Sequence, residues 1–190
     1  MNQDEYFSVN AGLTINVEPL SDGDVVPDEH TFSLEIPPLF RVASECNGLD
    51  DNLDRSLNTL NSSDQQALTT YLTAQNNKIN LLLSYVLSQQ NDPALRYTTT
   101  SFGASRLSYA NATALAEGSA VRVKLFLDNP AAAIYAYADV VECCEQNEQF
   151  EITLKYTRLQ EDDRDLLIRA ALHFQQKILR QRAQQRSESQ

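Results

Sequence analysis

The sequence predicts an α+β fold in which a long helix precedes a group of antiparallel strands and a second helix closes the chain. Apolar residues recur at steps of four and three between Leu68 and Gln89, the spacing of a helical heptad seam. After Asp92 and Pro93 the apolar period falls to two, which indicates strands. A helical period returns after the acidic residues at 161–163. The 190 residues, 42% of them hydrophobic, suffice for one domain with extensions.

The charge of the chain narrows the classes of partner. The formal net charge is -11 and the sequence pI is about 4.5, so the bulk surface disfavours nucleic acid and anionic lipid as partners. The first residues, MNQDEYFSV, do not resemble a secretory leader, and the sequence has no stretch of about 18 apolar residues. We therefore expect a soluble, cytoplasmic protein without membrane insertion.

Residues 1–48 are predicted to form N-terminal strands or an extension. Residues 6–17 alternate loosely and contain β-branched side chains, which favours one or two strands before the turn residues at 21–24. Residues 31–36, TFSLEI, also alternate, and an extended segment is expected there. Its apolar face would consist of Phe32, Leu34 and Ile36. The pattern leaves open whether this region is an edge of the β-structure or a separate docking arm.

Residues 49–92 are predicted to be a helical oligomerisation segment. Leucines at 49, 53, 57 and 60 lie on one face of a short helix. A capping box, Ser62 with Gln65 or Ser63 with Gln66, then starts a helix that runs from about residue 64 to residue 90. At 1.5 Å per residue this helix is ~40 Å long, which is more than a small domain needs to cover one open end.

A heptad seam on this helix predicts self-association. The seam residues are Leu68, Leu72, Gln75, Ile79, Leu82 and Val86, followed by Gln89. Further apolar residues widen the stripe beyond a two-stranded seam, which suits a bundle: Tyr71, Leu81, Leu83, Tyr85 and Leu87. Gln75 is a natural residue to set the register of such a bundle. The alternative is that this face packs wholly against its own domain and the preceding leucine helix.

Residues 93–182 carry the strand pattern and the closing helix. The expected strands are 96–101, 105–109, 120–127, 134–143 and 150–156. In the third of these, Val121, Val123, Leu125 and Leu127 face inward while Arg122 and Lys124 face outward. The closing helix begins at Glu161 with Asp162 and Asp163, because acidic residues are favourable at a helix start. The tail at 183–190 is expected to be disordered.

The sequence does not favour an enzyme or a metal protein. Cys46, Cys143 and Cys144 are an odd set without metal-binding spacing, and His30 and His173 lie in different segments. Free thiols at a strand end are the expectation for the adjacent pair, with a strained vicinal disulfide as the alternative. Glycine-rich phosphate loops and GxSxG or HExxH motifs are absent from the sequence, so no catalytic residue, metal ligand or resident cofactor is expected.

The stretch SFGASRLSY at 101–109 resembles the DxSxxG signature of PilZ domains, which are small bacterial β-barrels that bind cyclic di-GMP. The continuation at 107–109 sets the register, and the family's Asp, Ser and Gly become Ser101, Gly103 and Arg106. The segment FEITLKYTRLQEDDRDLLIRAALHFQQKILRQR at 150–182 is similar to the family's closing strand and helix. The resemblance thus implies an antiparallel PilZ-like β-barrel with a long inserted helix.

The same resemblance implies that the nucleotide site is lost. Ligand-binding members of the family carry an RxxxR pair before the signature, and here Arg41, Arg55 and Arg96 stand alone. Loss of two arginines and the guanine-reading Asp removes several charged hydrogen bonds of about 1.5 to 3 kcal/mol each. An alternative is an atypical cyclic di-GMP receptor that uses Arg96, Ser101 and Arg106, with help from the C-terminal arginines.

The layout is also similar to a divergent PilZ subgroup in which a heptad helix joins subunits into a tetramer. The resemblance implies a non-catalytic adaptor or regulator in bacterial cyclic di-GMP-linked signalling, in surface motility or type IV pilus control. Its expected partners are copies of itself, as a tetramer rather than a dimer, and an unidentified protein.

Overall fold

The computed structural model describes residues 8–21, 23–46, 62–128 and 130–188. The N-terminal part contains β1 (Ser8–Val9), β2 (Thr14–Pro19) and α1 (Glu29–Glu35), and residues 38–46 are also helical. The long helix α3 (Ser62–Ser88) and a 3-10 turn η1 (Pro93–Leu95) follow. The remaining elements are β3 (Arg96–Gly103), β4 (Arg106–Asn111), β5 (Ala120–Asp128), β6 (Ala131–Gln146), β7 (Gln149–Arg158) and α4 (Glu161–Glu188). The leucines at 49–60, predicted to form a short helix, lie outside the described residues.

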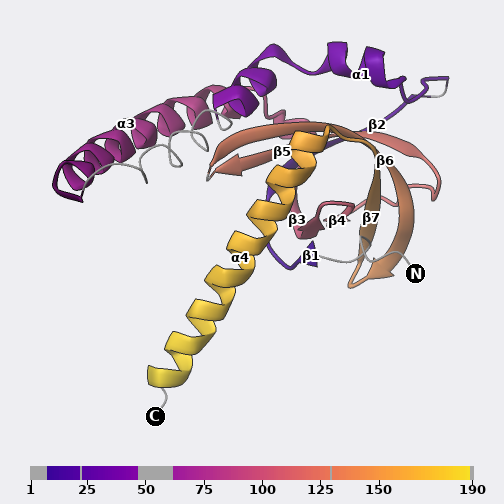
Figure 1. Cartoon of the computed structure of the whole chain (residues 1–190). Coiled ribbons are helices and arrows are strands. Elements are labelled where there is room, and N and C mark those ends of the chain that lie inside the picture. The colour runs from indigo at the N-terminus through magenta and orange to yellow at the C-terminus, as the bar shows by residue number, and fades with distance from the viewer. Residues whose placement is uncertain (1–7, 22, 47–61, 129, 189–190) are drawn as a thin grey trace.

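Six antiparallel strands close into a barrel (Figure 1). The strand order is β3-β2-β5-β6-β7-β4, and β4 pairs again with β3 to complete the ring. The short strand β1 extends the same edge of β3 that β2 uses, with Ser8 opposite Gly103. The predicted α+β class, the five predicted strands and the two long helices are therefore confirmed.

The inside of the barrel is the main hydrophobic core. Alternate residues of β5 are buried, and Arg122 and Lys124 between them are half-exposed, as the period of two predicts. Helix α4 covers one open end of the barrel, where Leu167 and Ala171 join the core and the ring of Phe174 meets that of Phe102 edge-on at 5.7 Å. This end closure fixes where α4 begins and in which direction it leaves the barrel.

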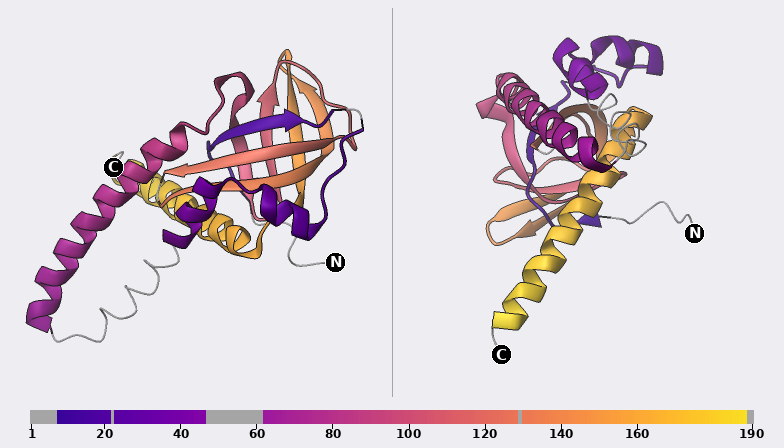
Figure 2. Two further views of the ribbon diagram at one scale, coloured as in Figure 1. Left: turned by 90° about the horizontal axis from the view of Figure 1, so that it is seen from above. Right: turned by 60° about the vertical axis from the view of Figure 1, so that its left-hand side comes forward.

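A second hydrophobic cluster lies on the outer surface of the barrel. Strand β6 is buried on both faces over residues 131–138, because helical segments cover the face that points away from the core. The cluster combines outward-facing residues of β6 with residues of α1, of 38–46 and of the α3 end: Phe32, Ile36, Phe40, Ala43, Leu87, Ala133, Tyr135 and Tyr137. Figure 2 shows the N-terminal helices lying across the strands.

The predicted extended segment at 31–36 is wrong, because α1 is a helix over Glu29–Glu35. The carboxylate of Asp28 caps this helix by accepting a hydrogen bond of 2.8 Å from the Thr31 backbone N–H. Phe32 and Ile36, four residues apart, then share the buried face, while Leu34 is 66% exposed. An alternating pattern of six residues is too short to separate a strand from a helix when the cap is overlooked.

The ends of two elements differ from prediction. Helix α4 continues to Glu188, so residues 183–188, expected to be part of a disordered tail, are helical. Strand β6 leaves β5 after Asp139 and continues with β7 as a two-stranded ribbon. The turn of this ribbon places Asn147 and Glu148 at φ 51° and 65°, the two-residue geometry that suits the twist of a hairpin.

Candidate functional site

The signature residues form the tight hairpin between β3 and β4. Phe102 pairs with Leu107 in register, and both side chains are buried in the barrel core. Ser101 pairs with Ser108 on the other face of the two strands, next to an irregularity in the register between Thr99 and Ser101. The stretch that resembles the signature is therefore a hairpin, and it carries Ser101, Gly103 and Arg106 at the three signature positions.

Contacts to β7 and α4 hold this hairpin in place. The guanidinium of Arg164, on the first turns of α4, donates a hydrogen bond of 2.8 Å to the carbonyl oxygen of Ala104. The backbone N–H of Tyr156 donates to the carbonyl oxygen of Ser105 at 3.0 Å. Arg164 also lies 3.4 Å from the Glu161 carboxylate. These bonds occupy the carbonyl oxygens of Ala104 and Ser105 in the turn. The bond from Arg164 also attaches the start of α4 to the hairpin.

Arg106 stands in register opposite Lys155 on β7. Its side chain is half-buried, and two cations directly opposite each other on neighbouring strands repel. Lys155 also stands in register opposite Asp139 on β6, so a carboxylate lies in the same cross-strand row as the two cations.

Arg96 belongs to a different structural unit, the junction between α3 and β3. Its guanidinium donates to the side-chain oxygen of Asn91 at 3.0 Å. The buried amide of Asn16 lies beside it, donating to Asn91 at 3.0 Å and to the Asp92 carbonyl at 2.9 Å, and accepting from the Asp92 N–H at 2.8 Å. Sequence reasoning missed Asn16, because nothing in a polar residue within a strand indicates a partner 75 residues away.

The structure does not gather the residues of the alternative receptor into one site. Arg96 and Ser101 lie on the same strand, about 16 Å apart at about 3.3 Å per residue. Arg182 lies about 30 Å from the start of α4 at 1.5 Å per residue, on the part that extends away from the barrel (Figure 1). A cavity of about 200 Å³ lies elsewhere, where α3 meets β5, and its polar lining includes Thr14, Ser88 and Asp128. It is smaller than the roughly 300 to 1,000 Å³ of usual ligand pockets.

Asp163, near the start of α4, carries a buried carboxyl group. Its side chain lies on the first turn of α4 and the residue is 5% exposed. Burial, and to a lesser extent the charge of Asp162, raise the pKa of Asp163 to about 7. This carboxyl group therefore exchanges a proton near neutral pH, which distinguishes it from the exposed acidic residues at the same helix start.

The predicted seam of α3 lies largely on the molecular surface. The end of the helix packs on β6 and β5, where Leu87 is buried and Leu83 is partly buried. Leu82 is 66% exposed, and the other large apolar residues exposed on the helix are Leu68, Tyr71, Ile79, Leu81, Tyr85 and Val86. Leu72 and Gln75 are half-exposed, and the Gln75 amide donates to the Tyr71 hydroxyl at 2.8 Å. Most of α3 extends beyond the barrel (Figure 2).

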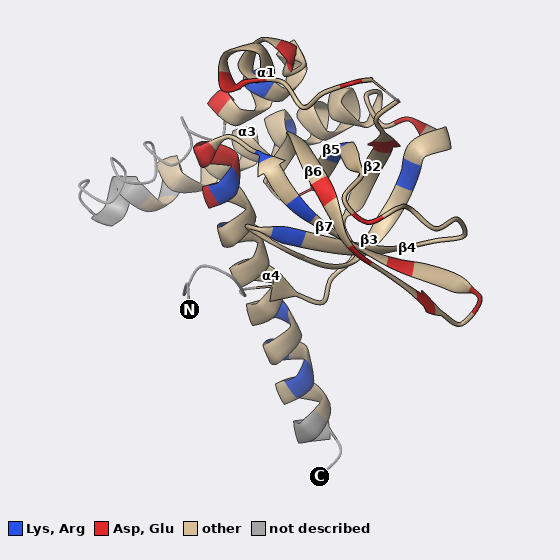
Figure 3. Ribbon diagram, turned by 90° about the vertical axis from the view of Figure 1, so that its right-hand side faces the viewer, with Lys and Arg blue, Asp and Glu red and all other residues tan. Residues whose placement is uncertain are grey.

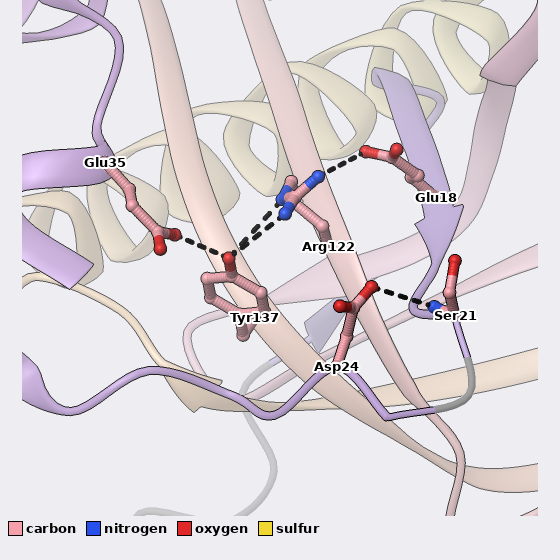
Figure 4. A network of polar contacts seen from close by, with 6 residues as sticks. All are labelled: Glu18, Ser21, Asp24, Glu35, Arg122 and Tyr137. Carbon is pink, nitrogen blue, oxygen red and sulfur yellow. Dashed lines mark hydrogen bonds and ion pairs between the residues drawn. The ribbon is translucent and has the colours of Figure 1, made fainter. Parts of the chain in front are cut away.

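A polar network fixes α1 against the barrel (Figure 4). Arg122 of β5 forms an ion pair of 2.8 Å with Glu18 of β2 and donates to the Tyr137 hydroxyl at 3.4 Å. The same hydroxyl donates to the Glu35 carboxylate at the end of α1 at 2.6 Å. Arg122, predicted only as an outward-facing strand residue, therefore links three segments that are distant in the sequence.

The two adjacent cysteines do not form a disulfide in the described structure. Cys143 is half-buried while Cys144 is exposed, and both thiols are free. A hydrogen bond of 3.4 Å to the Glu142 carboxylate raises the pKa of the Cys144 thiol. The described ranges contain no group of three side chains that could hold a metal ion. None of the described helices combines the length and apolarity needed to cross a membrane.

The chain resembles known proteins in its structure and not in its sequence. No protein-family model matches the sequence, and no curated protein matches it. Among solved structures, the chain is similar to the Bacillus subtilis inhibitor of motility MotI/DgrA, with 11% identity and a TM-score of 0.50. The match covers 93% of this chain and 53% of that protein, so this chain spans about half its length.

A second similar structure is a pathogenic protein from Xanthomonas campestris, a tetrameric PilZ domain that self-assembles via a helical bundle. The identity is 15% and the TM-score 0.53, over 92% of this chain and 91% of that one. Both matches include the helices as well as the barrel, because they extend over nearly the whole chain. The chain therefore has the fold of a divergent PilZ-like domain.

Proposed function

We propose that this protein is a non-catalytic PilZ-like regulator that self-assembles through α3 and does not itself bind cyclic di-GMP. Its setting would be cyclic di-GMP-linked signalling in the bacterial cytoplasm, in motility or type IV pilus control, where its barrel meets an unidentified protein partner. The fold supports the broad class, and the finer parts of the proposal depend on the features argued below.

The exposed apolar face of α3 is the observation that carries the proposal. Leu82 and its seam neighbours leave several large apolar side chains in water on one helix, which is unusual for a monomeric surface. The predicted seam Leu68, Leu72, Gln75, Ile79, Leu82 and Val86 would be covered in a bundle with α3 of other copies. The similar Xanthomonas protein assembles through a helical bundle, which supports a tetramer here.

The hairpin chemistry supports the loss of nucleotide binding. Ser101 and Gly103 offer no carboxylate to read guanine, and Arg96 is engaged with Asn91 at the other end of β3. The turn carbonyls of Ala104 and Ser105 already accept bonds from Arg164 and Tyr156. The barrel would then act as a protein-binding scaffold.

Isothermal titration of the purified protein with cyclic di-GMP tests the loss of binding. We expect no binding heat. A dissociation constant below ~10 μM, which corresponds to roughly -7 kcal/mol, would instead support a receptor. In that case Arg106→Ala should abolish the heat, because Arg106 is the cation that lies within the signature stretch itself.

Light scattering of Leu82→Asp tests the assembly. A charge in the middle of an apolar interface is strongly unfavourable, so the variant should have a lower mass than the unmodified protein. Asn77→Asp is the matched control, because Asn77 is exposed on the opposite side of α3 and the variant should keep the unmodified mass. A monomeric unmodified protein at tens of micromolar would contradict the proposal.

An atypical cyclic di-GMP receptor remains the alternative function. The observation in its favour is the position of Arg106 and Lys155, opposite each other beside the β3–β4 hairpin, where both cations would contact a bound phosphate. The titration above separates the two functions.

A further inference from the structure

We propose that the exposed side of α4 is a second self-association surface, which pairs antiparallel with α4 of a second copy. This contact is distinct from the α3 bundle and involves residues that the function proposed above does not use. It follows from a second seam on α4, from the part of that helix that leaves the barrel, and from the distribution of charge along it.

A seam with heptad spacing runs along the side of α4 that does not face the barrel. Its members lie at steps of three, four, three, four and three residues: Asp165, Ile168, Leu172, Gln175, Leu179 and Arg182. Ile168, Leu172 and Leu179 are 37%, 44% and 57% exposed, and the three polar members are also exposed. The buried face of the helix is made by other residues, including Leu167, Ala171 and Phe174. The seam is thus an apolar stripe that the barrel does not cover.

The distal part of α4 extends into solvent. Ile178 is the last residue of the helix that packs against the core, and the side chains of 179–185 are all exposed. Figure 1 shows this part of the helix leaving the barrel. Isolated helices shorter than about 12 to 15 residues are marginal in water, so a partner that covers the stripe would stabilise this extension.

The charges along α4 select the direction of the partner. Residues 161–170 of the helix contain four acidic residues and two arginines, Arg164 and Arg169, while Lys177, Arg180 and Arg182 lie in its distal half (Figure 3). In an antiparallel pair, the basic half of each helix lies beside the acidic start of the other. A parallel pair would place like charges together, which is unfavourable.

One antiparallel register pairs each seam residue with a seam residue of the second copy. Positions a and d of one helix face positions d and a of the other, so Ile168 lies against Leu179 of the second copy and Leu172 against its Gln175. In the same register Asp165 lies against Arg182 of the second copy, and each layer occurs twice by symmetry. The apolar layers and the charged layers therefore require the same alignment.

This match favours a second copy over other occupants of the stripe. A nucleic acid or anionic lipid surface would be attracted by the distal basic residues but repelled by Asp165 and the acidic start of the helix. A second copy of α4 supplies both the opposite charges and the apolar side chains.

Charge exchange tests the register by sedimentation velocity. Arg182→Asp and Asp165→Arg each turn two ion pairs into two repulsive pairs, and each should raise the dimer dissociation constant about 10-fold or more. The double variant, Asp165→Arg with Arg182→Asp, restores opposite charges and should return to within about threefold of the unmodified value. Circular dichroism checks that each variant keeps its helices.

Carrying out this series in the Leu82→Asp background separates the two surfaces. We expect Leu82→Asp alone to be dimeric through α4 and Leu82→Asp/Arg182→Asp to be monomeric. If Leu82→Asp leaves the mass unchanged while Arg182→Asp lowers it, the α3 proposal fails and the α4 proposal stands. A monomeric Leu82→Asp protein at about 100 μM, or single charge reversals that leave the mass unchanged, would overturn the α4 pairing. So would binding to anionic vesicles that Arg182→Asp abolishes without a change in mass.

Discussion

Asp163 shows how one buried side chain makes stability depend on pH. Its pKa is raised to about 7 by burial, whereas an unfolded Asp has a pKa near 3.9. Between these values the folded protein holds a proton that the unfolded chain releases. The contribution of Asp163 is therefore most favourable below about pH 4 and is lost as pH rises toward 7, at up to about 1.4 kcal/mol per pH unit.

Asp163→Asn should remove this dependence, because an amide does not titrate. From pH 5 to pH 7 the free energy of unfolding of the variant should rise by about 2 kcal/mol relative to the unmodified protein, measured by urea denaturation. Asp162→Asn is the control, and it should give a smaller change because Asp162 is exposed and acts only through its neighbour. Parallel pH profiles for Asp163→Asn and the unmodified protein would contradict the pKa shift.

At the level of elements, the Asp28 cap and the outer hydrophobic cluster determine the structure of α1, where the short apolar pattern at 31–36 alone does not. The Asp28 cap selects a helix, and the helix directs Phe32 to the outer face of β6, where Ile36, the residue after the helix, joins it. The polar network then fixes its end, through the contact between Glu35 and Tyr137.

Two alanine substitutions distinguish the buried face of α1 from the exposed one. Phe32→Ala should lower the free energy of unfolding by about 3 to 5 kcal/mol, because it empties a packed site. Leu34→Ala should change it by less than about 0.5 kcal/mol, since that side chain is mostly in water. If both variants lowered the free energy of unfolding equally in thermal or urea denaturation, the result would favour the predicted strand, in which Phe32 and Leu34 share one face.

The elements that could be predicted from the sequence are those in which the hydrophobic period continues over many residues. Helix α3 and strands β3 to β7 follow from sustained periods, and the barrel follows from the resemblance around the signature. Contacts between distant segments could not be predicted, because a single sequence carries no signal for pairs such as Asn16 with Asn91 or Arg122 with Glu18. The signature residues lie on the hairpin between β3 and β4, and the contact of this hairpin with α4 depends on Arg164, which the signature does not include.

At the scale of the whole molecule, β6 joins the two hydrophobic clusters. Ile134, Ala136 and Ala138 belong to the barrel core, while Tyr135 and Tyr137 between them belong to the outer cluster. Neither cluster can be exposed without disturbing the strand that they share. The N-terminal helices and the barrel should therefore unfold together.

Urea denaturation followed by two probes tests this coupling. Far-UV circular dichroism and tyrosine fluorescence, which reports on eight tyrosines in a chain without tryptophan, should give coincident transitions. The double variant Leu82→Asp/Arg182→Asp, which we expect to be monomeric, is the suitable protein, because a change of assembly would otherwise add its own transition. Two separated midpoints would show that the helices detach before the barrel opens.

The ribbon formed by β6 and β7 beyond the barrel has a consequence for solubility. The last ladder bonds on this side of β6 join Val140 to Gly118 and Ser119, and the ribbon continues past them as an edge. Such an edge is a template on which other chains can add strands and aggregate. Glu142 and Glu145 lie along this part of β6, and Glu148 occupies the turn. An identical ribbon approaching the edge would meet the same negative charges, so we expect these glutamates to oppose edge-to-edge pairing of the ribbon.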